Sequence, residues 1–156
     1  MQKITTFLWY DQEAEEAARF YCSIFKKSKI LGITRNLGAP GVTADVLTVQ
    51  FRLGDQEFTA LNGGPQFKFT EAISLMINCK DQKEVDYYWE KLLAGGGQES
   101  ACGWLKDRYG LSWQVTPAIL LEMISDRNRK KAQRAFEAMM QMVKIDIRKL
   151  KEAYDG

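Results

Sequence analysis

The sequence predicts an α+β protein in which the order strand–helix–strand–strand–strand occurs twice and is followed by helices. Asp11 and Asp81 each stand between a strand-forming stretch and an apolar pattern of helical period, and they are seventy positions apart. Each helical pattern is followed by strand-forming stretches that tight turns join into hairpins. Because the identity between the two halves is weak, the repeat is one of element order.

The first predicted module covers residues 1–65 of the single domain 1–156. Its first strand is Lys3–Tyr10, which is rich in β-branched and aromatic residues. Asp11 is expected to cap a helix that runs to about Phe25, since alanines and aromatic residues recur there at helical spacing. Three further strands are expected at 28–36, 45–53 and 57–62, with a loop at 37–41 and a tight turn at 54–56.

The second predicted module covers residues 66–117 and begins with a strand at 72–79. Asp81 is followed three residues later by Glu84, which is the spacing of a capping box at the start of a helix. Three glycines at 95–97 end this helix. A short strand is expected at 98–101, and a hairpin is expected with strands at 103–106 and 111–116.

A helical C-terminal extension is expected over residues 118–156. Its first helix is 118–124, and Asp126 can cap a second helix with an apolar stripe. The order of elements therefore changes after the second module from mixed to purely helical.

Composition and charge exclude several classes of protein. The net charge of +2 is too small to indicate a nucleic acid or an acidic membrane surface as partner. No apolar run reaches the roughly 18 residues of a membrane span. The N-terminal residues lack the order of a signal peptide. We therefore expect a cytoplasmic protein, with its three cysteines reduced and with no nucleic-acid or membrane partner.

The sequence contains no histidine. This absence excludes the Ser-His-Asp and Cys-His triads, the His-Glu-x-x-His zinc helix and the iron site built from histidine and carboxylate. General acid–base catalysis would fall to carboxylates, Lys, Tyr or Cys. A metal site would need oxygen or thiolate ligands alone.

Several long segments resemble one family, in the order in which that family has them. The segments are FLWYDQEAEEAARFYCSIF, ALNGGPQFKFTEAIS, DQKEVDYYWEKL, CGWLKDRYGLSWQVTP and the ending KIDIRKLKEAYDG. They resemble the PhnB-like branch of the vicinal oxygen chelate superfamily, which includes glyoxalase I, bleomycin-resistance proteins and extradiol dioxygenases. Members of this branch often carry the description 3-demethylubiquinone-9 3-methyltransferase. The resemblance covers essentially the whole chain.

The resemblance implies a fold of paired βαβββ modules, each with a curved four-stranded sheet. Two modules pair around a concave pocket, either within a chain or across a swapped dimer, and a homodimer is expected here. Metal-using members place one ligand on the first and fourth strands of each module. Their last ligand is a Glu in a pattern like Asp-x-x-Gly-x-x-x-Glu.

In this sequence the pattern reads Asp107-x-x-Gly110-x-x-x-Gln114, so Gln114 stands where the metal carboxylate would be. By the same resemblance the other ligand positions fall on neutral or apolar residues: Ser74, Thr6 or Ile4, and Asn62. Because neutral hydroxyls and amides bind divalent transition metals poorly, we expect no metal and no cofactor.

The candidate contacts of a small-molecule ligand are therefore Thr6, Asn62, Ser74, Trp104, Trp113 and Gln114. The two tryptophans could line an apolar pocket or pack in the core. Gln114 could contact a ligand, or it could be a buried amide that ties two strands together.

Four functions are compatible with these observations. The first is a small-molecule pocket without the usual metal, used for binding or for metal-independent chemistry. The second is a methyltransferase. Its Gly-rich cofactor loop would follow a strand, whereas Gly95–Gly97 follows a helix. The third is a metal-dependent glyoxalase or dioxygenase that uses distant carboxylates such as Asp45 or Glu57. The fourth is an interaction module with the C-terminal helices as partner surface.

Overall fold

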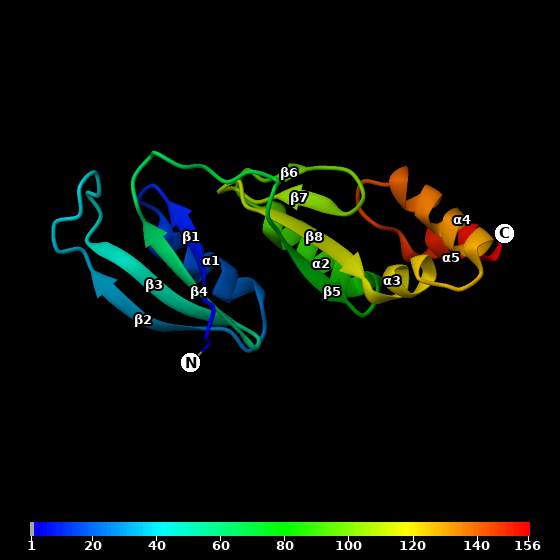
Figure 1. Cartoon of the computed structure of the whole chain (residues 1–156), viewed down its shortest axis with the longest axis horizontal. Helices are drawn as coiled ribbons and strands as arrows, with labels where there is room; N and C mark the ends of the chain where they lie inside the picture. Colours follow the sequence, from blue (N-terminus) through cyan, green and yellow to red (C-terminus); the bar gives the residue numbers. More distant parts are fainter. Residues whose placement is uncertain (1) are drawn as a thin grey trace. The chain divides into compact units, whose positions relative to one another are not determined.

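The structure is a computed structural model that describes residues 2–156 and contains two compact units. One unit ends at Phe69, and the other runs from Thr70 to Gly156 (Figure 1). Each unit contains one four-stranded sheet, with strand order β1-β4-β3-β2 in the first and β5-β8-β7-β6 in the second. In both sheets the first strand lies at an edge and pairs in parallel with the fourth. The predicted repeat of βαβββ modules and the α+β class are confirmed.

The first unit has its helix on one face of its sheet. Its elements are β1 (Thr6–Tyr10), α1 (Ala14–Ile24), β2 (Lys29–Arg35), β3 (Val46–Leu53) and β4 (Gln56–Asn62). The Tyr10 hydroxyl donates a hydrogen bond of 3.1 Å to the Tyr21 hydroxyl on α1, and the Tyr21 ring stacks on Phe51 of β3. Leu8 and Tyr10 alternate along β1 on this covered face, and both are buried.

The expected cap of the first helix is wrong. Helix α1 begins at Ala14, three residues after Asp11, so the Asp11 carboxylate comes too early to cap its first turn. The Ala14 N–H donates instead to Asn62 Oδ1 at 2.8 Å, and Asn62 Nδ2 donates to the Val46 carbonyl at 2.9 Å. Asn62 is 1% exposed and therefore joins α1 to β3 and β4 from inside the unit.

The second unit repeats these elements and adds the helical extension. Its elements are β5 (Ser74–Cys79), α2 (Gln82–Leu93), β6 (Gln98–Glu99), β7 (Trp104–Lys106), β8 (Ser112–Pro117), α3 (Ala118–Ile124), α4 (Arg129–Met140) and α5 (Ile147–Asp155). The Asp81 cap is confirmed, because its carboxylate accepts from the Glu84 N–H at 2.9 Å. The Glu84 carboxylate reaches back to the Lys80 N–H at 2.8 Å, one residue before the cap.

The expected cap of the second extension helix is also wrong. Helix α4 begins after Asn128, whose side chain accepts from the Lys131 N–H at 3.2 Å. Asp126 accepts instead from the Asn128 N–H and from the Tyr154 hydroxyl of α5. Asp126 therefore joins the α3–α4 connection to the last helix.

Helix α2 covers one face of the second sheet. Trp89 Nε1 donates to the Glu99 carboxylate of β6 at 3.1 Å. Glu99 lies opposite Leu105, and Leu105 lies opposite Trp113. Because residues directly opposite in a sheet share a face, these side chains all lie on the α2 side. The buried Leu105, Trp113 and Val115 form the core of this layer.

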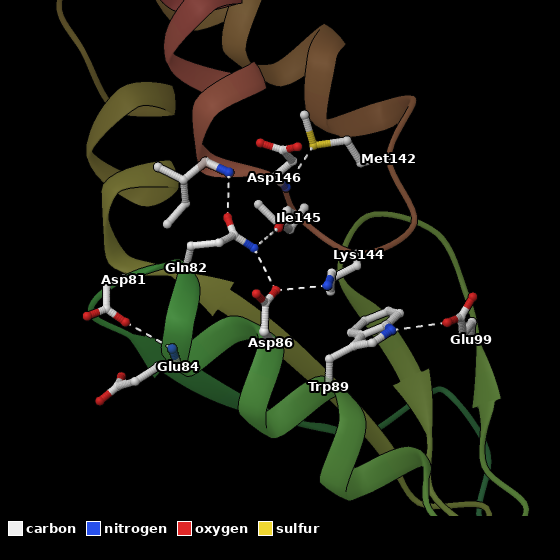
Figure 2. A network of polar contacts seen from close by, with 11 residues as sticks. Asp81, Gln82, Glu84, Asp86, Trp89, Glu99, Met142, Lys144, Ile145 and Asp146 are labelled. Atoms are coloured by element: carbon white, nitrogen blue, oxygen red, sulfur yellow. Dashed lines mark hydrogen bonds and ion pairs between the residues drawn. The ribbon is translucent and has the colours of Figure 1, made fainter.

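The helical extension is held by the residues just before β7 and by α2. The Cys102 and Gly103 N–H groups donate to the carbonyls of Met142 and Val143, both at 2.8 Å. The Gln82 side chain donates to the Ile145 carbonyl at 3.0 Å and accepts from the Ile147 N–H at 2.8 Å (Figure 2).

The three extension helices have an apolar core of their own, made by Leu120, Met123, Ala135, Ile145 and Leu150. They gather beyond the C-terminal end of β8 (Figure 1). Within residues 2–156, none of the helices has both the length and the apolar character that a membrane crossing requires.

The turn between β7 and β8 depends on the Asp107 carboxylate. Its Oδ1 accepts from the Tyr109 and Leu111 N–H groups at 2.9 and 3.1 Å, and its Oδ2 accepts from Trp113 Nε1 at 2.9 Å. Gly110 has a φ of 87°, which a residue with a side chain rarely adopts. The Asp-x-x-Gly part of the motif therefore builds the hairpin.

Replacing Asp107 by Asn is expected to lower the free energy of unfolding by about 2–4 kcal/mol, because the new NH₂ group must face a buried N–H donor. Urea denaturation would measure the loss. Asp55→Asn is the matched control, because Asp55 is exposed in the turn between β3 and β4, and its change should stay within about 0.5 kcal/mol. Equal losses in the two variants would contradict this role of Asp107.

Candidate functional site

The second sheet has a face opposite α2, which we call the open face. Side chains alternate along a strand, and residues opposite in register share a face, so the open face follows from the pairing of β5, β7 and β8. Its residues include Ser74, Met76 and Asn78 of β5, Trp104 and Lys106 of β7, and Ser112, Gln114 and Thr116 of β8. Three of the predicted site residues, Ser74, Trp104 and Gln114, are therefore brought to one surface.

Gln114 lies at the centre of the open face. Its register partners are Met76 on β5 and Trp104 on β7. Gln114 Nε2 donates to Ser74 Oγ at 2.8 Å, so the amide does tie two neighbouring strands together. Within residues 2–156, its Oε1 oxygen accepts no hydrogen bond. The amide thus has a structural bond on one side and an acceptor available to a ligand on the other.

A cavity of about 250 Å³ is lined by Trp104 and Ser112, which are the register partners of Gln114 and Ser74 on the neighbouring strands. Its lining also includes Lys106 of the open face and Glu71, which precedes β5, and is completed by Gln98, Glu99, Ser100 and Leu105. Lys106 Nζ lies 2.9 Å from Glu71 Oε1. The hydrogen bond from Lys106 lowers the pKa of the Glu71 carboxyl below its usual value, so the carboxylate stays ionised at neutral pH.

Ser112 differs from the other residues of the cavity. Ser112 is only 1% exposed, and its Oγ has no hydrogen-bond partner among the described residues. Buried hydroxyl groups almost always have a partner, so this hydroxyl requires an explanation. It lies directly opposite Lys106 in the pairing of β7 and β8.

The other predicted site residues do not reach the open face. Trp113 lies on the α2 side, where its indole N–H is bound by Asp107. Asn62 lies in the first unit and holds the start of α1. Thr6 also lies in the first unit. It is two residues before the buried Leu8 on β1, so it shares the α1 side with Leu8 and Tyr10. Ile4, the alternative to Thr6, precedes β1 and is exposed.

Of the eight residues that line the cavity, sequence reasoning predicted only Trp104, and three of the missed residues matter most for the site. Lys106 could have been found, because it is two residues from Trp104 on one strand and must share its face. Ser112 is likewise two residues from Gln114. Glu71 could not have been found, because only the folded chain brings it to Lys106.

The residues present do not fit a divalent transition metal. Ser74 and Gln114 offer a hydroxyl and an amide, and neither carries a negative charge to balance the cation. In the part of the chain that the structure describes, no three His, Cys, Asp or Glu residues gather to hold a metal ion.

A larger groove of about 950 Å³ runs between α2 and α5. Its walls carry charges of both signs that are paired with each other, as Lys144 is with Asp86 and Arg148 is with Glu152, both at 2.8 Å. The smaller cavity also contains an ion pair, but in addition it holds the buried Ser112 hydroxyl, which has no partner among the described residues, so it is the better candidate site.

Comparison with known proteins gives a family. The family model described as 3-demethylubiquinone-9 3-methyltransferase matches residues 2–116. A search of curated proteins finds no match. The PhnB protein from Bacillus cereus is 38% identical, and the match covers 75% of this chain and 100% of that one, with a TM-score of 0.68.

Two further solved structures share the fold at low identity. Protein PA1353 from Pseudomonas aeruginosa is 17% identical, covers 75% of this chain and 98% of its own, and has a TM-score of 0.62. A gene product from Arabidopsis thaliana is 16% identical, with a TM-score of 0.50. The match covers 72% of this chain and 96% of the Arabidopsis protein.

The family match ends at residue 116, so the helical extension lies outside it. The Bacillus cereus protein is covered along its whole length and shares more than a third of the aligned residues. The resemblance seen in the sequence is confirmed over residues 2–116, and the family match does not include the ending at 144–156: the chain belongs to the PhnB-like family described as 3-demethylubiquinone-9 3-methyltransferase.

Proposed function

We propose that the open face of the second sheet binds a small organic molecule, without a divalent metal, through Gln114, Ser74 and Trp104. The observation that carries this proposal is the Gln114–Ser74 pair, which shares a face of the sheet with Trp104, a residue that lines the cavity. The amide oxygen supplies a fixed acceptor, and the indole supplies an apolar surface on which a planar group can lie. A few oriented polar groups next to an aromatic wall are typical of small-molecule sites.

A methyltransferase is a second candidate, favoured by the description of the family. A common type of methyltransferase binds its cofactor at a Gly-rich loop between a strand and a helix of an alternating β-α sheet. Here the strand-to-helix connections, residues 11–13 and 80–81, contain no glycine. Titration with S-adenosylmethionine separates the two candidates, because only the second requires this ligand to bind.

The neutral donor set predicts that the purified protein does not retain a divalent metal. After incubation with Zn²⁺, Ni²⁺, Mn²⁺ or Fe²⁺ and removal of the excess, elemental analysis should find well below one metal per chain. A metal at one per chain in the unchanged protein would mean that oxygen ligands do form a chelate site. Gln114→Glu is the informative variant, because it restores the carboxylate that the resemblance implies.

Binding at the open face can be tested with 2-naphthamide, a planar and uncharged molecule, by isothermal titration calorimetry. Trp104→Ala should weaken its binding about tenfold, because base-like planar groups gain on the order of 1–3 kcal/mol from stacking on an aromatic side chain. Gln114→Ala should weaken it severalfold through the lost hydrogen bond.

Tyr87→Ala is the matched control for that experiment, since Tyr87 is an exposed aromatic residue of α2, outside the open face. Its affinity for 2-naphthamide should equal that of the unchanged protein. No binding of 2-naphthamide at all, or equal loss in the Trp104 and Tyr87 variants, would remove the support for this site.

We also propose a homodimer. The extension presents Phe136, Met140 and Val143 with 47%, 49% and 47% of their surface exposed, and such apolar patches mark interaction surfaces. Light scattering at micromolar concentration should return twice the mass of the 17.9 kDa chain. The mass of a single chain would contradict the dimer and leave the ligand site untouched.

A further inference from the structure

We propose that the molecule bound at the open face carries a carboxylate, and that this carboxylate displaces Glu71 from Lys106. The inference rests on the proposed function and names the chemical class of the ligand: a planar, largely apolar carboxylic acid. Glu71 lies in the cavity as an internal substitute for the acidic group of that ligand.

The cavity has a cation and a hydroxyl on neighbouring strands. Lys106 and Ser112 are directly opposite in the antiparallel pairing of β7 and β8, so their side chains emerge about 5 Å apart on one face. Both line the same cavity of about 250 Å³. A carboxylate has two oxygens, so it can accept from the ammonium with one and from the hydroxyl with the other.

Of the two donors, only Lys106 has a hydrogen-bond partner within residues 2–156. The Glu71 carboxylate lies 2.9 Å from Lys106 Nζ, whereas Ser112 Oγ has no partner among the described residues. A buried hydroxyl without a partner is uncommon and costs stability. An acidic ligand that reached both groups would satisfy Ser112, which Glu71 leaves unsatisfied.

Glu71 can be displaced with little loss. Its side chain is 61% exposed and that of Lys106 is 37% exposed, and ion pairs between exposed groups contribute little to stability. Once released, the Glu71 carboxylate returns to water, where it is well solvated. When the ligand carboxylate replaces Glu71 at Lys106, the charge of Lys106 stays balanced. The ligand also accepts a hydrogen bond from Ser112, which Glu71 does not, and this bond favours the exchange.

The rest of the ligand follows from the neighbours of Lys106. Trp104 lies two residues from Lys106 on β7 and on the same face. Gln114 lies opposite Trp104, and Met76 lies opposite Gln114 on the next strand. An acid group held at Lys106 and Ser112 would place an attached ring over Trp104, with the acceptor of Gln114 at its edge. These surfaces favour a flat apolar body joined directly to the carboxylate.

The test compares 2-naphthoate with 2-naphthamide by isothermal titration calorimetry on the full chain, because the two molecules have the same ring and nearly the same shape, and the amide replaces the charged carboxylate by a neutral group with one acceptor oxygen and an NH₂ donor. Glu71→Gln should tighten 2-naphthoate about fivefold, since a competing anion is removed, and should leave 2-naphthamide unchanged. Lys106→Met should weaken 2-naphthoate at least about fivefold and leave 2-naphthamide unchanged. Ser112→Ala should weaken 2-naphthoate about threefold.

Glu152→Gln is the matched control, because it removes one carboxylate from another exposed ion pair of the same unit, at Arg148. It should change neither affinity, which separates a local effect at Lys106 from a general change of net charge. Binding of 2-naphthamide together with an unaltered affinity for 2-naphthoate in the Glu71 and Lys106 variants would overturn this inference alone. Failure of 2-naphthamide to bind would count against the proposed function itself.

Discussion

In each unit one helix covers a single face of a four-stranded sheet, and this constraint decides what every strand residue can do. Successive side chains on a strand point to opposite faces, so a position either packs under the helix or belongs to the face opposite it. Trp113 and Gln114 show the consequence. Trp113 is buried on the α2 side with its N–H on Asp107, whereas Gln114 binds Ser74 on the open face. Adjacent residues of one motif therefore serve stability and the candidate site separately.

The same constraint explains how far the sequence could be used to predict the structure. The element order and the Asp81 cap were predictable, because periodicity and capping are local and act over a few residues. The Asn62 bond to the Ala14 N–H joins residues 48 positions apart, so no local pattern reveals it. Asn62 and Thr6 were placed in the site through ligand positions of a resembling family. The pairing of β1 with β4 assigns them to the α1 side.

The helical extension lies outside the family match, yet it is built into the second unit without closing the open face. Its bonds go to the backbone at Cys102 and Gly103 and to Gln82 at the start of α2. Gly103 is required at this junction, because an added Cβ would come within 3.0 Å of the Val115 carbonyl. The extension therefore adds an apolar core of its own at one end of the sheet.

The change from Glu to Gln in the motif alters the charge that the site can hold. A carboxylate at position 114 would balance part of the charge of a divalent cation, and that cation would in turn attract an acidic or polar ligand. A neutral amide at this position cannot balance the charge of such a cation. Lys106 supplies a positive charge on the same face without any metal, and Glu71 neutralises it while no ligand is bound. In the proposed carboxylate site, Lys106 would attract the anionic ligand in place of a metal cation. That recognition would combine the charge of Lys106, the hydroxyl of Ser112 and the displacement of Glu71.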